Sequence, residues 1–218
     1  MFSDAVKVIR NSKIQGKGAV ARRPIHAGEL IFKIDSNITL VRLHEILSWP
    51  QNERKEFLTF AIQVGKYEYL FREGNIEYLN HSCEPNAWWE GYGTLVAHRD
   101  IDAGEEVTYD YVTTNIQLNY EMKCTCGSPT CRGVFSNNDY LRTDFQNRFG
   151  NHLPQHVLNA IQEAADPSQK KIRGTQLPTD VIEALKQAEL DEDTLRKKYG
   201  NQLPEHVIEK IKSIIARN

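Results

Sequence analysis

Short apolar segments separated by turns run through the first half of the chain, from residue 6 to about residue 112. The segments are four or five residues long and rich in β-formers, and glycine or proline turns such as Ala27-Gly28-Glu29 stand between them. Short runs of this composition, bounded by turn residues, are typical of β-strands. The pattern predicts strands at residues 6–9, 18–21, 30–34, 67–71 and 94–97.

One helical segment interrupts this strand-like region. Ser48 is a suitable N-cap residue, and Pro50 suits the first turn of a helix. Leu58 and Ile62 lie four residues apart, a spacing that places two side chains on one side of a helix. We therefore predict a helix that begins at Ser48 and presents Leu58 and Ile62 to the core.

From about residue 137 the chain becomes polar and helical in period, and it contains an internal repeat over residues 150–161, 174–185 and 200–211. Each copy begins with a glycine and has a proline four residues later, where a helix tolerates it. Apolar residues follow on one stripe, as at Leu153, Val157, Leu158 and Ile161. Two interpretations stay open: a helical cap on the core, or a module that docks a partner or substrate.

Composition narrows the possible classes. The 218 residues are 40% hydrophobic with a net charge of -2, and the pI is about 6.4, so nothing indicates a nucleic-acid-binding face. No apolar run reaches the ~18 residues of a membrane span, and the N-terminus lacks a signal-peptide pattern. We expect a nuclear or cytoplasmic protein that is neither secreted nor membrane-bound.

Four cysteines form the candidate metal site. Cys124, Cys126 and Cys131 share one short loop, and Cys83 is the only other cysteine. Disulfides are rare in reducing compartments, so the alternatives are free thiols or a metal. Structural zinc takes four ligands in a tetrahedron, and the four thiolates complete that number, although His81 or His98 could replace one of them.

Three motifs stand in order around these cysteines. They are Gly16-Lys17-Gly18-Ala19, Asn80-His81-Ser82-Cys83-Glu84-Pro85-Asn86 and Gly104-Glu105-Glu106-Val107-Thr108-Tyr109-Asp110-Tyr111. Together with the cysteine loop they resemble the SET-domain protein-lysine methyltransferases with a post-SET zinc loop, over roughly residues 5–135. A lone Gly-x-Gly is a weak signal, but the two signatures and the loop in this order are specific.

The resemblance implies a reaction. It implies methyl transfer from S-adenosylmethionine to a protein lysine, with Tyr111 as the catalytic tyrosine and Tyr109 at the position that tunes the number of methyl groups. A tyrosine there implies a channel that favours lower methylation. A tyrosine-walled channel suits the chemistry because burial lowers the pKa of a lysine amine, which must be neutral to attack. Taken alone, the two tyrosines are also compatible with strand residues that face opposite sides of a sheet.

The resemblance also assigns binding residues. It implies cofactor contacts from the residues Lys17, Gly18, Ala19, Tyr69, Asn80 and His81, and zinc ligation by Cys83, Cys124, Cys126 and Cys131. From the residues alone, His81 is equally a satisfied core histidine and Tyr69 a core aromatic.

We expect a mainly β chain with α additions: a SET β-fold whose two signature segments form a pseudoknot. The expected division is a SET domain over 1–120, a post-SET zinc loop over 121–136 and a helical extension of three repeats over 137–218. The expected function is lysine methylation of a protein substrate, a histone tail or other basic peptide, without direct nucleic-acid or membrane binding. The alternative is a catalytically silent SET module that binds a protein partner through its helical tail.

Overall fold

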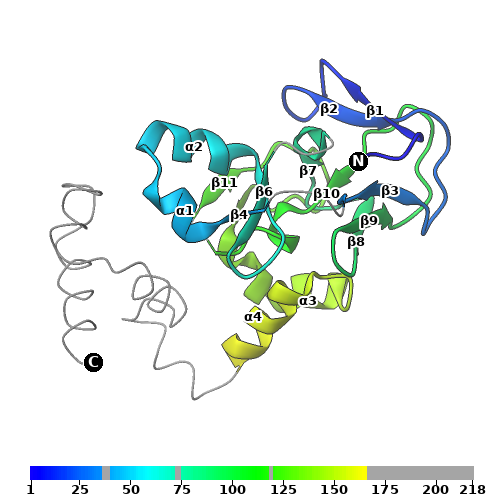
Figure 1. Cartoon of the computed structure of the whole chain (residues 1–218). Helices are drawn as coiled ribbons and strands as arrows, with labels where there is room; N and C mark the ends of the chain where they lie inside the picture. The colour runs from blue at the N-terminus through cyan, green and yellow to red at the C-terminus, as the bar shows by residue number, and fades with distance from the viewer. Residues whose placement is uncertain (36–39, 72–74, 118–119, 166–218) are drawn as a thin grey trace, which may run out of the picture.

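The computed structural model describes residues 1–35, 40–71, 75–117 and 120–165. The second and third repeats, 174–185 and 200–211, lie outside the described residues. In the described part the fold is mainly β, built from small two- and three-stranded sheets with short helices between them (Figure 1). This confirms the predicted fold class. None of the described helices is both long and apolar enough to cross a bilayer.

Two sheets contain four of the predicted strands and, at residues 87–90, a strand that was not predicted. They use the strands β1 (Val6–Ile9), β2 (Gly18–Ala21), β3 (Leu30–Lys33), β8 (Ala87–Glu90) and β9 (Thr94–Ala97). β1 and β2 form an antiparallel hairpin, and the other sheet has the order β3-β9-β8. Trp88 and Trp89 point to opposite faces of β8, so Trp89 is 1% exposed in the core while Trp88 is only partly buried.

The third sheet carries the helical region, and here the predicted helix start was wrong. The elements are β4 (Val41–Arg42), α1 (Leu43–Ser48), α2 (Gln51–Phe60), β5 (Ala61–Gln63) and β6 (Glu68–Phe71). Ser48 is the last residue of α1, and Pro50 is itself the N-cap of α2. Ile62 belongs to β5, because the backbone turns extended at Ala61 and pairs with β6. Tertiary strand pairing overrode the helical spacing.

The segments after β6 bring the second half of the domain back into its centre. They form the elements η1 (Ile76–Tyr78), β7 (Asn80–His81), β10 (Thr108–Tyr109), η2 (Tyr111–Thr113), β11 (Glu121–Lys123) and β12 (Val134–Ser136). β7 and β10 pair in parallel, and β11 and β12 form an antiparallel hairpin that presents the cysteine loop at its tip. The two signature segments therefore lie side by side, as the pseudoknot requires.

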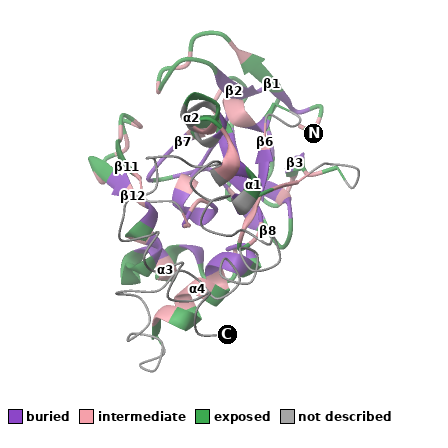
Figure 2. Cartoon of the chain, turned by 60° about the vertical axis from the view of Figure 1, so that its left-hand side comes forward, coloured by how far each residue is buried: buried purple, intermediate pink, exposed green. Residues whose placement is uncertain are grey.

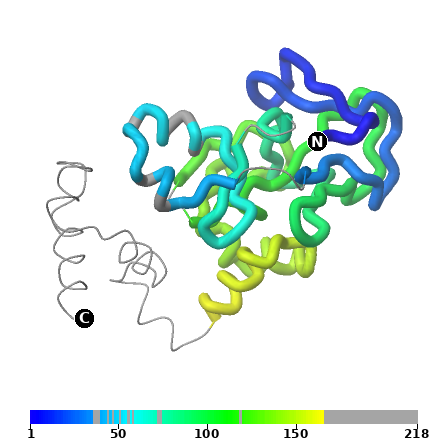
Figure 3. Tube along the Cα trace, in the orientation of Figure 1, coloured from blue at the N-terminus to red at the C-terminus, as the bar shows by residue number. Residues whose placement is uncertain are grey.

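The first repeat is part of the folded body. The chain continues through η3 (Asn137–Leu141), α3 (Thr143–Phe149) and α4 (Gln155–Ala165). These helices lie at the end of the molecule opposite the β1–β2 hairpin (Figures 1 and 3). Their inner faces are buried (Figure 2). One apolar cluster joins them to the segment after β10, with the buried members Val112, Ile116, Phe135, Tyr140, Phe145, Phe149, Leu153 and Val157. Each fully buried aliphatic or aromatic side chain contributes ~1.5–3 kcal/mol relative to exposure.

Further contacts join residues 143–165 to the central signature and to the segments that follow each signature. Arg148 donates to the backbone carbonyl of Cys83, and the His152 ring stacks on Trp88 with centroids 3.6 Å apart. His156 is 8% exposed and its Nε2 lies 2.8 Å from the Thr114 carbonyl, so Nε2 carries the proton and donates. In residues 143–165 the tail therefore covers the core, which supports the cap interpretation for the first repeat.

His156 makes this packing sensitive to pH. Burial lowers its pKa from the ordinary 6.5, so folding favours the neutral ring. The stability it contributes is present above the unfolded-state pKa and is lost as pH falls below about 6.5. A His156→Gln variant, which keeps an N–H donor, should show a flatter melting temperature between pH 7 and pH 5 than the wild type.

Candidate functional site

The site is built where the two signature segments meet. Thr108 pairs with Asn80 and Tyr109 with His81, and the Ser82 N–H donates to the Tyr109 carbonyl at 3.2 Å. Asn86 locks the pair: its side chain accepts from the Thr108 N–H at 2.9 Å and donates to the Glu106 carbonyl at 2.8 Å. These contacts fix the backbone on both sides of the tyrosines.

Tyr111 has its hydroxyl inside the protein. The hydroxyl donates to the Leu79 carbonyl at 2.9 Å, and the Tyr111 N–H donates to His81 Nδ1 at 3.2 Å. Burial raises the pKa of the phenol above its ordinary value, with the His81 contact opposing, so the hydroxyl stays protonated at neutral pH. Tyr111 begins η2 and is not a strand residue, so the alternative of two strand residues facing opposite sides does not describe this pair.

Tyr109 and Tyr120 complete an aromatic group with Tyr111. The Tyr109 ring lies 5.1 Å from the Tyr111 ring and 5.9 Å edge-on from Trp89, and Tyr109 is 3% exposed. Burial raises the pKa of Tyr109 well above the usual value and also that of Tyr120. The Tyr120 hydroxyl is buried and has no hydrogen-bond partner among the described residues. The three rings form an apolar environment with protonated hydroxyls, which suits a neutral amine.

Asn80 joins the Gly-x-Gly turn to the signature segments. Its Nδ2 lies within hydrogen-bond distance of Ser12 Oγ (3.0 Å), the Gln15 and Lys17 carbonyls (3.1 and 2.9 Å) and Glu106 Oε1 (2.8 Å). An amide has two N–H bonds, which here are shared among four acceptors. Ser12 also donates to Glu106 at 2.7 Å. The structure thus brings Asn80, Lys17 and Gly18 together.

The Gly-x-Gly turn needs both glycines for different reasons. Gly16 has a φ of 52°, in the left-handed region that favours glycine. At Gly18 the constraint is packing, since a Cβ there would lie 2.5 Å from Glu106 Oε1 and 2.9 Å from Ser12 Cβ. Lys17, between them, places its Nζ 4.8 Å over the Tyr78 ring and leaves its charge near the surface.

A Gly18→Ala variant should therefore displace Glu106 and loosen Asn80. We expect a loss of ~1–3 kcal/mol of unfolding free energy, as for other overpacked sites, and weaker binding of S-adenosylmethionine. Thermal melting and titration calorimetry measure both quantities. Gly28→Ala is the control for packing. A side chain is strained there too, at a φ of 81°, but an added Cβ has no atom within 4 Å and Gly28 lies in another turn. If Gly18→Ala matches wild type in both measurements, the packing argument fails.

The other expected cofactor residues are placed differently. Ala19 is fully buried in the core, and its carbonyl accepts the Val107 N–H at 2.8 Å. Tyr69 is 3% exposed and packs with Leu43, Ile46 and Phe57 in the cluster under α1 and α2, with its hydroxyl buried and without a hydrogen-bond partner among the described residues. For Tyr69 this placement matches the core-aromatic alternative.

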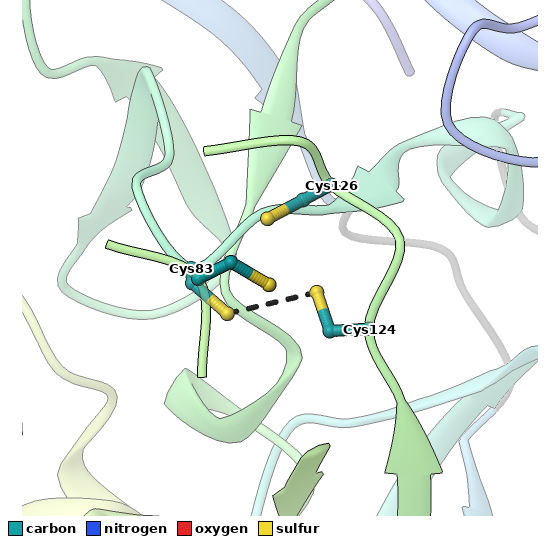
Figure 4. A group of neighbouring side chains, drawn as sticks. Cys83, Cys124 and Cys126 are labelled. Carbon is teal, nitrogen blue, oxygen red and sulfur yellow. Dashed lines mark hydrogen bonds between the residues drawn. The ribbon is translucent and has the colours of Figure 1, made fainter. Parts of the chain in front are cut away.

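The four cysteines converge although Cys83 lies far from the loop in sequence. Their sulfur atoms all lie within 4.8 Å of one another, and Cys83 Sγ is 3.6 Å from Cys124 Sγ. Figure 4 shows Cys83, Cys124 and Cys126 with their side chains directed at a common centre. Tetrahedral zinc with Zn–S bonds of about 2.3 Å requires sulfur atoms about 3.8 Å apart. The arrangement fits zinc.

Burial raises the pKa of the Cys83 thiol, and N–H groups around its sulfur oppose that shift. Arg132 directs its Nε (3.3 Å) and its backbone N (3.4 Å) to Cys83 Sγ, and His81 Nε2 lies 3.4 Å from the same sulfur. Burial, followed by the charge of Arg132, lowers the pKa of His81 to about 3, so the ring is neutral. Because Nδ1 accepts from Tyr111, the proton lies on Nε2 and points at the sulfur. His81 is thus a hydrogen-bond donor to the cluster, while His98 packs on Trp88.

Several residues of the site were not predicted from the sequence. Ser12 and Glu106 hold Asn80, while Arg132 and Asp110 form a buried ion pair at 2.7 Å. The sequence offered one indication of these residues: Glu106 and Asp110 lie within the motif over 104–111, and Arg132 directly follows Cys131. Two acidic side chains near the site make contacts with other segments: Glu84 accepts from Ser128 at 2.7 Å, and Glu90 pairs with His152 at 3.0 Å.

Comparisons with known proteins agree with these motifs. The SET domain family model matches residues 16–112. Histone-lysine N-methyltransferase ATX2 of Arabidopsis thaliana is 31% identical over 147 residues, which cover 59% of this chain and 13% of that protein. An H3 lysine-36-specific histone-lysine N-methyltransferase of Eremothecium gossypii is 29% identical over 157 residues, which cover 67% of this chain and 22% of the relative. The chain thus spans less than a quarter of the length of these relatives.

Among solved structures, the methyltransferase domain of human histone-lysine N-methyltransferase SETMAR is 20% identical with a TM-score of 0.46, and the match covers 61% of this chain and 57% of that one. The family match covers both signature segments and the Gly-x-Gly turn, and these are the segments that the structure brings together. Over residues 16–112 the chain therefore matches the SET domain family.

Proposed function

We propose that this chain transfers a methyl group from S-adenosylmethionine to a lysine side chain of a protein, with a histone-type protein as substrate. The observation that carries the proposal is the position of Tyr111: its hydroxyl lies 2.9 Å from the Leu79 carbonyl, and its ring lies 5.1 Å from the buried Tyr109 ring. The relatives named histone-lysine N-methyltransferases support the substrate class. A histone substrate implies action in the nucleus.

The residues present suit the cofactor. Lys17 offers a cation to a carboxylate, and Asn80 offers amide groups between the Gly-x-Gly turn and β7. The cofactor would supply an electrophilic methyl group on a sulfonium. A neutral lysine amine would form the new N–C bond as the C–S bond breaks, a neutral sulfide would leave, and the methylated ammonium could release its proton to solvent. We assign cofactor contacts to Lys17, Gly18, Asn80 and His81; Ala19 lies in the core next to Gly18, and Tyr69 packs in the cluster under α1 and α2.

The tyrosines would prepare the lysine amine for the reaction. Their rings exclude water from the amine, and burial in such surroundings favours the neutral amine that must attack. The Tyr111 hydroxyl donates its proton to the Leu79 carbonyl. Its oxygen lone pairs therefore point away from Leu79 and can orient the amine and the methyl group. Tyr109 fills the space beside it, and we propose that its hydroxyl limits the number of methyl groups that fit.

Zinc at Cys83, Cys124, Cys126 and Cys131 would have a structural role. Four thiolates leave no open coordination position, which is the arrangement of closed structural sites. The metal would join the hairpin tip to the segment that carries Asn80 and His81. We propose the division into a SET domain (1–120), a zinc loop (121–136) and a helical extension (137–218) on this basis.

The proposal is tested with labelled S-adenosylmethionine. The full chain, loaded with zinc, is incubated with core histones and separately with a whole-cell protein extract. We expect label on histone bands and, after acid hydrolysis, in methyl-lysine. Label only on other proteins would keep the reaction and overturn the histone substrate. No label from a chain that binds zinc and S-adenosylmethionine would favour the silent binding module instead.

A further inference from the structure

We propose that Arg132 is a positioning residue for Tyr111, through which the cysteine cluster controls the placement of the catalytic hydroxyl. The proposal rests on the role assigned to Tyr111 above. Arg132 follows Cys131 directly, so whatever holds Cys131 also fixes the start of the Arg132 side chain. The side chain is 12% exposed and reaches inward from the loop between Cys131 and β12.

The Arg132 guanidinium bridges the cluster and the catalytic signature. Nη2 lies 2.7 Å from Asp110 Oδ2, Nη1 forms an ion pair at 3.0 Å with Asp139, and Nε donates to Cys83 Sγ at 3.3 Å. The plane of the guanidinium lies over the Phe135 ring at 5.6 Å. A planar fork can meet all these partners at once, whereas a lysine ammonium is a single point charge. Arginine is therefore required by geometry as well as by charge.

Asp110 transmits the contact to Tyr111. It is 1% exposed and is the N-cap of η2, where its Oδ1 accepts the Val112 N–H at 3.1 Å. A buried carboxylate is costly without a cation, so Arg132 is what holds it in place. Tyr111 is the first residue of η2, and its orientation follows from this cap.

His81 provides a second connection on the other side of Tyr111. Its Nδ1 accepts the Tyr111 N–H, and its Nε2 faces Cys83 Sγ, which Arg132 also contacts. Two neighbouring backbone N–H groups, those of Tyr111 and Val112, are thus fixed by groups that touch Arg132 or Cys83. A small displacement of a reacting group costs up to about 100-fold in rate, so this coupling has a functional consequence.

The test is amide hydrogen exchange at Tyr111 and Val112 in the zinc-loaded full chain, measured without substrate, together with kinetics. In Arg132→Lys we expect one zinc per chain. Exchange at these two amides should be about tenfold faster, which corresponds to loss of an ordinary hydrogen bond. The kcat should be about 10- to 100-fold lower, with KM for S-adenosylmethionine within about twofold of wild type. Arg142→Lys makes the same substitution at an exposed arginine paired with Asp144; it is the matched control and should equal wild type.

Wild-type exchange at Tyr111 and Val112 in zinc-loaded Arg132→Lys would overturn the proposal. If Arg132→Lys does not retain zinc, Asp110→Asn decides, because asparagine keeps the cap on Val112 but loses the charge that Arg132 holds. Accelerated exchange in that variant at full zinc content supports the bridge, and unchanged exchange overturns it. The exchange readout needs no methyl transfer, so failure of the proposed function gives a different result from failure of the bridge.

Discussion

A Cys83→Ser variant is expected to lose zinc and about 3–5 kcal/mol of unfolding free energy, which for a chain of this size lowers the melting temperature by roughly 10 °C. Cys83 is 1% exposed, and its sulfur receives N–H groups from Arg132 and His81. Serine removes the metal ligand and leaves the buried Arg132 without its sulfur partner. Because the metal would hold the hairpin tip to β7, its binding free energy is part of the folding free energy.

The effect of a chelator identifies the cause of this loss. A chelator should lower the melting temperature of the wild type to near that of Cys83→Ser and change the variant little. Ser128→Ala is the control, since it removes an exposed hydrogen bond to Glu84 in the same loop without touching a sulfur. A wild-type chain that contains no zinc after purification in zinc-containing buffer, and whose melting ignores the chelator, would contradict the metal assignment.

A Tyr111→Phe variant is expected to lower kcat about 100-fold or more while it leaves the dissociation constant of S-adenosylmethionine within about threefold. Removal of one preorganised polar contact at a reacting centre typically costs 10²–10³ in rate. The ring packing with Tyr109 and His81 is retained in phenylalanine. The Leu79 carbonyl loses its donor, so we also expect a loss of ~1–3 kcal/mol of stability.

Tyr140→Phe separates the catalytic effect from the loss of stability. Tyr140 is 7% exposed and lies in the apolar cluster with Phe145 and Phe149, outside the two signature segments. Its variant should keep wild-type kcat. Equal kcat values for Tyr111→Phe and wild type would remove Tyr111 from the chemistry and leave Tyr109 or Tyr120 as the tyrosine to examine.

The strands were predictable from the sequence because their signal is local. The cysteine cluster was predictable because the chain has only four cysteines. Residues 6–9 and 94–97 are short β-branched runs between turns, and both are strands in the structure. Counting indicated the four cysteines but left His81 or His98 as possible replacements, and the resemblance implied Cys83 as the fourth ligand. In the structure the four sulfur atoms lie within 4.8 Å of one another. The tail was predictable as helical, and α4 confirms this for the first repeat.

The rest depended on contacts between distant segments. Ser48 is a residue type that favours a helix start, but it ends α1. The pairing of β5 with β6 decides where α2 stops. Glu106 meets Ser12 across 94 residues, and Arg132 meets Asp110 across a gap that includes the whole cysteine loop. Burial and charge compensation make these pairs necessary, but no local pattern announces them.

The most direct test of the central claim is mass spectrometry of a histone substrate after incubation with S-adenosylmethionine and either the zinc-loaded wild type or Tyr111→Phe. The account predicts that the wild type adds the mass of methyl groups to a lysine and that the variant adds none. The number of methyl groups per lysine should be low, as Tyr109 implies. An unmodified substrate with the wild type, or equal modification by Tyr111→Phe, would contradict it.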